Sequence, residues 1–363
     1  MRKLLRQIII FSISIFVLSG CRNDEVDLTD TLYNPVPFTV SIPDGYPIFE
    51  VPADNPLTVD GVALGRRLFY DTILSADGSL SCGSCHNQQL SFTDGLSVSP
   101  GVDGLTGSRS SMSLLDVGFS TRGLFWDGRV GTLEEQALLP VEDPIELHNS
   151  WPDVIEKFRA HEEYPELFRK AFGIENDSEI TKELAGMAIA QFERTLVSSG
   201  NSKYDRVLAA RDIFTEEEQI GFEIYFKEGM TGLPDGQCFH CHGGPLLTNN
   251  DFVNNGLDSV SSYLDFADPG RGAVLGISEQ NGKFRTPTLR NIAQSAPYMH
   301  DGRFQTLEEV MDHYTSGGQP SIGKNGLIDS IFLDESQKAA VVAFLKTLTD
   351  TDFMNNPAYE DPN

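Results

Sequence analysis

The residues best suited to chemistry in this sequence lie in two copies of one pattern, Cys-x-x-Cys-His. The first copy spans residues 82–86 and the second spans residues 238–242. This pattern is the attachment signature of a c-type haem, in which both cysteines form thioethers to the porphyrin and the histidine is the proximal iron ligand. A structural zinc site would need four ligands at close spacing, and a redox dithiol would not predict a histidine after both pairs. We therefore expect two covalent haems, attached through Cys82, Cys85 and His86 and through Cys238, Cys241 and His242.

The fifth cysteine, Cys21, follows a segment typical of export. Residues 1–7 are basic, residues 8–18 form an apolar run of eleven, and Leu-Ser-Gly-Cys ends at Cys21. Eleven apolar residues are too few to span a bilayer and are typical of a secretory signal, here residues 1–20. The last four residues resemble a bacterial lipobox, so Cys21 is a candidate lipidation site, and an ordinary cleaved signal is the alternative. We expect an exported protein, lipid-anchored to a bacterial membrane and facing the periplasm or cell exterior, with residues 21–54 as an acidic tether.

Length and charge limit the classes of partner. The chain has 363 residues, 40% of them hydrophobic, and a formal net charge of −26 at pH 7. This length accommodates two domains of ordinary size. Such an acidic protein repels phosphate, so nucleic acid is excluded as a partner. The charge favours a basic partner such as a lysine-rich electron carrier, or it simply keeps the protein soluble. A homodimer is also compatible with the sequence.

The sequence around the two haem motifs is itself repeated. The cysteines of the two motifs are 156 residues apart, and matches further along the chain are offset by 176 and 174 residues. Three matches in the same order, at slowly changing offsets, indicate two copies of one haem domain, predicted over residues 55–200 and 201–363. The matched pairs are Gly65 with Gly221, Arg109 with Arg285, and residues 127–135 with residues 301–309.

Helices are expected to position these motifs. Four helix starts have Thr or Asp followed three residues later by Glu or Gln, which is a capping box. These starts are Thr132, Thr215, Thr306 and Asp334. Apolar residues then recur at helical spacing, for example from Val341 to Leu348. Residues 151–196 contain further helical stretches that should connect and brace the copies, and strand signals are short. The sequence predicts a mainly α protein.

Because the two copies can be aligned, the residue expected at the sixth coordination position of one iron can be compared with that at the other. In the second copy, Tyr314 follows Leu307 at i+7 on the inward face of a helix. The corresponding residue of the first copy is Pro140, which cannot ligate iron. We therefore expect the second haem to be closed by Tyr314 and the first to be open to small ligands. A core role for Tyr314, with Met311 or Met299 as the ligand, is the alternative.

An open haem that reacts with peroxide needs a nearby group that moves a proton between the two oxygens. Gln136 shares the inward face of its helix with Leu133, and Glu146 ends a run from Pro140 that we expect to be extended. A lone glutamate in an acidic chain is more often a surface charge. Trp126, which aligns with His300 of the second copy, is either a core residue or an electron relay between the haems.

As a set, these motifs resemble the bacterial di-haem cytochrome c peroxidases and their MauG-like relatives over about residues 55–350. The resemblance implies two tandem cytochrome c-like domains, with peroxide reacting at the first haem and electrons entering at the second. It also implies Gln136 and Glu146 as active-site residues, with Glu146 as the proton shuttle, and Trp126 between the haems. The motifs that carry the resemblance include residues 64–71, 81–86, 125–129, 133–136, 287–291, 296–302 and 344–348.

Two departures from the common family pattern matter. Peroxidases that need reductive activation carry a histidine in the loop before the tryptophan, whereas this chain has none between residues 87 and 147. We therefore expect an active site that is open without prior reduction. Tyr314 stands where ordinary peroxidases have a methionine ligand, which is similar to MauG and predicts a second haem of low potential. The family's calcium site would fall on Ser110, with Ser295 and Pro297 as carbonyl donors, but Ser110 replaces the expected asparagine.

These features predict a di-haem peroxidase that reduces hydrogen peroxide to water with electrons from a small cytochrome or cupredoxin. The first alternative is a MauG-like oxidase that modifies a protein or organic substrate through Trp126 and Tyr314. The second is a lipid-anchored electron carrier without catalysis. The absent loop histidine and Tyr314 favour the MauG-like oxidase over a standard peroxidase, whereas Gln136 and Glu146 argue against a mere carrier.

Overall fold

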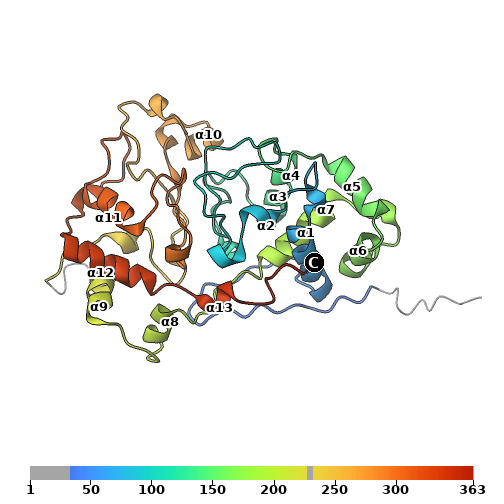
Figure 1. The fold of residues 1–363 in the computed structure, drawn as a ribbon, viewed down its shortest axis with the longest axis horizontal. Helices are drawn as coiled ribbons and strands as arrows, with labels where there is room; N and C mark the ends of the chain where they lie inside the picture. Colours follow the sequence, from blue (N-terminus) through green and yellow to red (C-terminus); the bar gives the residue numbers. More distant parts are fainter. Residues whose placement is uncertain (1–32, 227–231, 363) are drawn as a thin grey trace, which may run out of the picture. The chain divides into compact units, whose positions relative to one another are not determined.

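Each half of the chain is built on a pair of crossed helices (Figure 1). In the computed structural model, which describes residues 33–226 and 232–362, α1 (Val59–Tyr70) crosses α7 (Lys182–Glu193) and α9 (Glu216–Phe226) crosses α12 (Glu335–Lys346). Glycine stands at both crossings. A Cβ added to Gly65 would lie 1.9 Å from the Ala188 carbonyl oxygen, and one added to Gly221 would lie 1.9 Å from that of Ala340. The repeat inferred from the sequence therefore extends to the contact between the helices.

The first core surrounds the α1–α7 crossing. Phe69 of α1 packs edge-on against Phe92 and Phe192, with ring centroids 6.1 and 5.3 Å apart. Helices α5 (Trp151–Ala160) and α6 (Tyr164–Phe172) extend this core through Phe158 and Tyr164. The helices predicted between the haem motifs are present. One of them, α7, is the partner of α1 rather than a connector.

The second core surrounds the α9–α12 crossing in the same way. The Phe344 ring of α12 contacts the rings of Tyr204, Phe222 and Tyr225 at 5.1–5.8 Å. Helix α11 (Leu307–Thr315) packs on α12. The capping boxes predicted at Thr306 and Asp334 are both formed, and Thr215 exchanges the same two hydrogen bonds with Glu218.

The remaining elements are short. Strands β1 (Phe252–Val253) and β2 (Phe284–Arg285) form an antiparallel pair in the register Phe252–Arg285. The other helices are α2 (Cys82–Cys85), α3 (Leu133–Gln136), α4 (Leu139–Glu142), α8 (Lys203–Leu208), α10 (Arg271–Leu275) and α13 (Thr351–Met354). The 3-10 helices are η2 (Thr72–Leu74), η3 (Gln88–Leu90), η4 (Val117–Phe119), η5 (Asp177–Glu179), η6 (Cys238–His240), η7 (Tyr263–Asp265), η8 (Ser278–Gln280), η9 (Ile292–Gln294) and η10 (Ile328–Ser330). The predicted mainly α class is confirmed.

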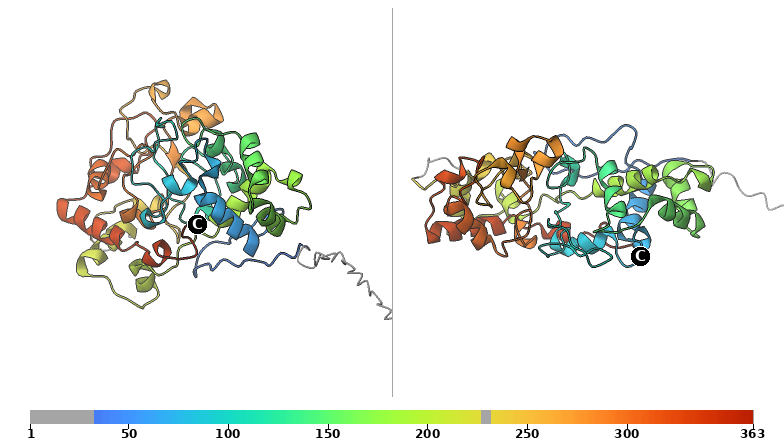
Figure 2. Two further views of the ribbon diagram at one scale, coloured as in Figure 1. Left: turned by 45° about the vertical axis from the view of Figure 1, so that its right-hand side comes forward. Right: turned by 90° about the horizontal axis from the view of Figure 1, so that it is seen from above.

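Both ends of the described chain pack against the rest of the protein. Val40, Ile42, Tyr46 and Phe49, in the segment expected to be a tether, pack against Phe119, Val197 and Leu246. At its C-terminal end the chain returns to the first core (Figures 1 and 2). There Phe353 of α13 and Tyr359 contact Phe92. Burial of these apolar side chains holds both segments. The exact domain limits stay a prediction, and the signal segment with Cys21 lies outside the described residues.

A buried ionic network joins the halves. The guanidinium of Arg290, which is only 3% exposed, donates two hydrogen bonds of 3.0 Å to the Asp205 carboxylate and lies 4.0 Å from that of Asp116. Asp116 accepts a 3.0 Å hydrogen bond from the Ser198 amide, and burial raises its pKa to about 6. Both charges have partners, as buried charges require. Among the described residues, no helix is long and apolar enough to cross a bilayer.

Replacing Gly65 by alanine tests the role of the crossing. The new methyl group would meet the Ala188 carbonyl oxygen, so the helices must move apart. We expect Gly65→Ala to lower the free energy of unfolding by about 1–3 kcal/mol, as overpacking does, and the melting temperature by several degrees. Thermal unfolding of the haem-loaded protein, followed by circular dichroism, measures this.

The matched control is Gly326→Ala, because a Cβ at Gly326 has open space around it. Equal melting temperatures for Gly65→Ala and the control would contradict the proposed role of the crossing.

Candidate functional site

Both predicted proximal histidines are held in one tautomer by main-chain carbonyls. His86 Nδ1 lies 2.8 Å from the Phe92 carbonyl oxygen, and His242 Nδ1 lies 3.1 Å from that of Pro287. An N–H at Nδ1 leaves the Nε2 lone pair free for a metal. Burial lowers the pKa of both imidazoles, that of His242 to about 4, so both are neutral at pH 7. Each histidine thus has the protonation state and orientation that haem ligation requires.

A mainly apolar cavity in the second half has the shape of a haem pocket. Cys238, Cys241 and His242 line one part of it, and Tyr314 of α11 lines another. Leu307, Val310 and Met311, from the face of α11 that was predicted to point inward, also line this cavity, as does Met299. The attachment residues, an apolar lining and a neutral histidine together fit a covalent haem.

Tyr314 lies inside this cavity and is positioned by its neighbours. The Asn255 amide donates towards the Tyr314 hydroxyl at 3.4 Å and towards the Met299 sulfur at 3.3 Å. His313, next to Tyr314, is turned away and its Nε2 lies 3.0 Å from the Asn255 carbonyl oxygen. Burial raises the pKa of the Tyr314 phenol. The geometry brings Tyr314, Met299 and Met311 into the second cavity, and the choice of Tyr314 as iron ligand stays a prediction.

The first site is formed by α2 and by the chain after α4. Cys82 and Cys85 lie on α2, and burial is the main cause of the raised pKa of both thiols. Negative charge adds to the shift, from Glu193 and then Glu146 at Cys82, and from Asp94 and then Glu146 at Cys85. Glu146 is therefore near enough to the attachment cysteines for its charge to act on both thiols, and its role in catalysis stays a prediction. Burial, with the nearby Asp143 charge, raises the pKa of Glu146 to about 7. Gln136 is half-buried at the end of α3, and no side-chain hydrogen bond joins it to another described residue.

The run from Pro140 to Glu146 is not extended, contrary to our expectation. Leu139–Glu142 forms α4, and a turn follows in which the Glu146 amide donates to the Asp143 carbonyl oxygen at 3.0 Å. Proline is well accommodated in the first turn of a helix, where its missing N–H is not needed. Pro140 therefore separates α3 from α4, whereas the corresponding helix of the second copy, α11, runs unbroken to Thr315.

The loop that lacks a histidine packs against the Glu146 segment. The Val102 amide donates to the Glu146 carbonyl oxygen at 2.9 Å, and Asp103 lies 2.5 Å from His148 Nδ1. Gly101 has no room for a side chain, because a Cβ would lie 2.3 Å from the Ile145 carbonyl oxygen. This loop fixes the main chain that carries Glu146.

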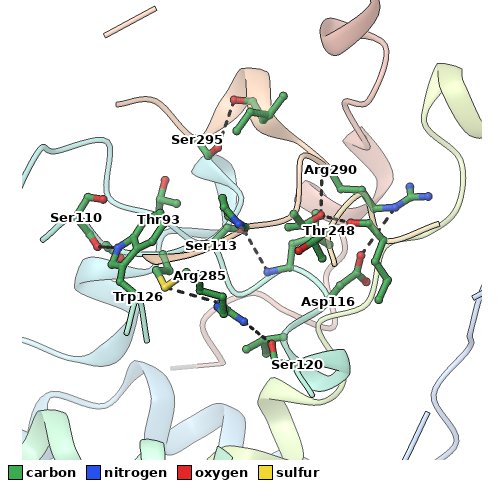
Figure 3. Close-up of a pocket in the computed structure, with 18 of the residues that line it drawn as sticks. Thr93, Ser110, Ser113, Asp116, Ser120, Trp126, Thr248, Arg285, Arg290 and Ser295 are labelled. Atoms are coloured by element: carbon green, nitrogen blue, oxygen red, sulfur yellow. Dashed lines mark hydrogen bonds and ion pairs between the residues drawn. The ribbon is translucent and has the colours of Figure 1, made fainter. Parts of the chain in front are cut away.

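Trp126 lies between the two halves. Its side chain lines both the second haem cavity and a neighbouring pocket, and its Nε1 donates to the Ser110 carbonyl oxygen at 2.9 Å (Figure 3). Its own carbonyl oxygen accepts a 2.8 Å hydrogen bond from the Arg285 amide on β2. Trp126 is thus held at the contact between the two halves, and its role as an electron relay stays a prediction.

The candidate calcium ligands line the same pocket as Trp126. Ser110, Ser295 and Pro297 all contribute to it. The Ser110 hydroxyl already donates to the Met299 carbonyl oxygen at 3.0 Å, and the Ser295 hydroxyl donates to Ile292 at 3.3 Å. None of the three supplies the carboxylate that calcium sites commonly use. The calcium ion stays a prediction that this donor set supports poorly.

Sequence reasoning assigned no role to two residues of the site. Asn255 contacts Tyr314 and Met299, but a single asparagine in a loop carries no signal. Arg285 was noted only as the repeat of Arg109, yet it is buried beside Trp126 (Figure 3). Its match to Arg109 in the repeat was the available signal for Arg285.

Comparisons with known proteins agree with this geometry. A family model for di-haem cytochrome c peroxidase matches residues 59–212. The methylamine utilization protein MauG of Methylorubrum extorquens is 36% identical over 300 residues, covering 82% of this chain and 80% of the relative. The cytochrome-c peroxidase IdrP1 of Pseudomonas sp. strain SCT is 33% identical over 350 residues, covering 87% and 86%.

The fold is also found in a solved structure. The crystal structure of a MauG-like protein associated with microbial copper homeostasis has 37% sequence identity and a TM-score of 0.82, covering 90% of this chain and 99% of that one. The predicted fold of two tandem cytochrome c-like domains, each with one c-type haem, is confirmed. The chain belongs to the di-haem cytochrome c peroxidase family, which includes MauG, and is a haem-dependent oxidoreductase.

Proposed function

We propose that this protein reduces hydrogen peroxide at the haem of its first half, with electrons that enter at the haem of its second half. The observation that carries the proposal is the half-buried Glu146 beside Cys82 and Cys85. The first haem, when bound, supplies the iron that coordinates peroxide and delivers electrons to it. The protein must supply the proton transfer and keep the position opposite His86 open.

Glu146 is suited to proton transfer at neutral pH. Its pKa of about 7, raised by burial and Asp143, leaves about half of the carboxyl groups deprotonated near neutrality. In that form Glu146 accepts the proton of the inner peroxide oxygen and passes it to the outer one, which must leave as water. Because the loop around Val102 fixes the main chain at Glu146, this carboxylate is already in place before peroxide arrives. Gln136, at the end of α3, is proposed as a neutral hydrogen-bonding partner in the same site.

Electron delivery is supported by the position of Trp126. Its indole lines the cavity that contains Cys238, Cys241 and His242, although its sequence belongs to the first copy. A small redox protein, a cytochrome or cupredoxin with a basic surface, is the proposed donor. The formal net charge of −26 would attract such a donor over distances comparable to the Debye length. We further propose that Cys21 anchors the exported protein to the membrane.

A MauG-like oxidation of a protein or organic substrate is a second candidate function. It is favoured by Tyr314 inside the second cavity, together with Trp126 at the junction. The two functions differ in how quickly a small electron donor returns the peroxide-treated protein to its resting state. Stopped-flow mixing of the oxidised protein with peroxide, followed by a reduced cytochrome, distinguishes them. Fast reduction supports the peroxidase. A long-lived oxidised state that the cytochrome reduces only slowly supports the MauG-like reaction.

Replacing Glu146 by glutamine tests the proton-transfer role. We expect the second-order rate constant for reaction with peroxide to fall by roughly 10²–10⁴-fold, the range typical of general acid–base catalysis. In the wild-type protein this constant should fall as the pH drops below about 7, because the carboxylate must accept a proton and protonation blocks it. The variant should lose this pH dependence. Stopped-flow kinetics from pH 5 to pH 9 measure both effects.

Glu142→Gln is the matched control, since Glu142 is exposed on the neighbouring helix α4 and should leave the kinetics unchanged. Wild-type kinetics in Glu146→Gln, at full haem content, would remove the assigned role.

Replacing Tyr314 by methionine tests its role as an iron ligand. Thioether ligation favours ferrous iron more than phenolate ligation does. We expect the potential of the second haem to rise by on the order of 0.1–0.4 V, part of the ~0.8 V range that axial ligands span. Potentiometric titration followed by absorption spectroscopy measures the change.

Tyr298→Phe is the control, because Tyr298 lines the same cavity but donates its hydroxyl to the Ile292 carbonyl oxygen. If Tyr314→Met and Tyr314→Phe both keep the wild-type spectrum and potential, Tyr314 is not a ligand.

A further inference from the structure

Arg285 is a buried cation without an anionic partner in the described part of the chain. Its side chain is 8% exposed. Nη1 donates to the Ser120 hydroxyl at 2.7 Å, and Nη2 reaches only the Met112 sulfur at 3.8 Å. Within residues 33–226 and 232–362, Nε has no hydrogen-bond partner at all. An uncompensated buried charge is strongly unfavourable, so an anion is expected at this position.

Two other arginines of this chain, the buried Arg290 and the half-buried Arg109, show what Arg285 lacks. Arg290, five residues further on, has the Asp205 and Asp116 carboxylates. Arg109, the residue that Arg285 repeats, binds Asp127 at 2.6 Å and Asp268 at 2.7 Å. Burial lowers the pKa of Arg285 to about 10, which still leaves the guanidinium charged at pH 7. The buried Arg194 likewise pairs with Glu134 at 2.6 Å. The carboxylate partner that these arginines have is therefore missing at Arg285.

The position of Arg285 indicates where the missing anion lies. The residue sits on β2, where its amide is bonded to the Trp126 carbonyl oxygen and its strand pairs with Phe252. Its side chain lines the pocket of Trp126 and Ser110 (Figure 3). It also lines the cavity of Cys238, Cys241 and His242. The group that occupies the second of these spaces is the covalent haem, which carries two propionate carboxylates.

We propose that the guanidinium of Arg285 pairs with a propionate carboxylate of the second haem. A guanidinium presents parallel N–H donors that match the two oxygens of a carboxylate, and the free Nε is one of these donors. The haem is covalently fixed through Cys238 and Cys241, so the paired charges would keep one geometry. Arg285 would thereby be a cofactor-binding residue that also holds the haem edge next to Trp126.

The pairing has a consequence for the potential of the second haem. Reduction adds one negative charge to the haem, so a neighbouring fixed cation favours the reduced form. Arg285 therefore opposes the low potential that phenolate ligation by Tyr314 would give. This inference rests on the presence of the haem and not on the proposed peroxide reaction.

The test is a potentiometric titration of the haem-loaded variants Arg285→Gln and Arg285→Lys, with the two haems separated by absorption and EPR spectra. In Arg285→Gln, we expect the equilibrium constant for reduction of the second haem to fall at least tenfold, equivalent to 59 mV for a one-electron couple. Arg285→Lys, which keeps the charge, should stay within about threefold of wild type. Arg122→Gln is the control, because Arg122 is 56% exposed and paired with Asp251.

An unchanged second potential in Arg285→Gln at full haem content would overturn the proposal, as would a shift confined to the first haem. A shift in Arg285→Lys as large as that in Arg285→Gln would also overturn it, because charge would then not be the cause. If Arg285→Gln fails to retain the second haem, retention with a near wild-type potential in Arg285→Lys supports the pairing, and loss in both variants counts against it.

Discussion

The absence of a side chain at two helix crossings is the constraint on which the rest of this structure depends. At Gly65 and at Gly221 the helix backbones are so close that a methyl group would meet a carbonyl oxygen of the partner helix. This closeness brings Phe69 and Tyr225, each four residues after its glycine, against the haem motifs. The Phe69 ring lies 6.4 Å from the His86 ring, and the Tyr225 hydroxyl donates to the His242 carbonyl oxygen at 2.7 Å. The crossings therefore set the position of the proximal histidines, so the geometry of each haem site depends on the glycine at its crossing.

One proline accounts for much of the difference between the two copies. In the second copy α11 continues to Thr315 and carries Tyr314 into the haem cavity. In the first copy Pro140 interrupts the corresponding helix, and the chain turns after α4. That turn places the Glu146 carboxyl near Cys82 and Cys85. The break between α3 and α4 at Pro140 is thus followed by a titratable group at one site, whereas the uninterrupted helix α11 carries a phenol to the other.

Local patterns predicted much of this arrangement, and long-range packing accounts for what they missed. The capping boxes at Thr215, Thr306 and Asp334, the inward face of α11 and the glycine pair are encoded within a few residues or within the repeat, so the sequence was sufficient. At Thr132 only the bond from the Glu135 amide to the Thr132 hydroxyl is formed. The extended run expected before Glu146 was wrong because Pro140 lies in the first turn of a helix, α4, where proline is well accommodated. When the chain returns to the first core, Tyr359 contacts Phe92, a residue more than 260 positions away in the sequence. No local sequence pattern predicts such a contact. The role of Arg285 could not be predicted for a related reason. Its lack of an anionic partner becomes visible only when all of its neighbours in space are known.

The buried charges of the two sites differ in a way that separates proton transfer from electron transfer. Glu146, with a pKa of about 7, can gain or lose a proton under ordinary conditions. Arg285, with a pKa of about 10, keeps its charge at neutral pH. A group that titrates is useful where oxygen must be protonated, but it would make the potential of an electron-transfer haem depend on pH. A fixed cation avoids that dependence. The proposed arrangement, with proton transfer at the first haem and a potential insensitive to pH at the second, thus follows from the ionisable group that each copy places near its cofactor.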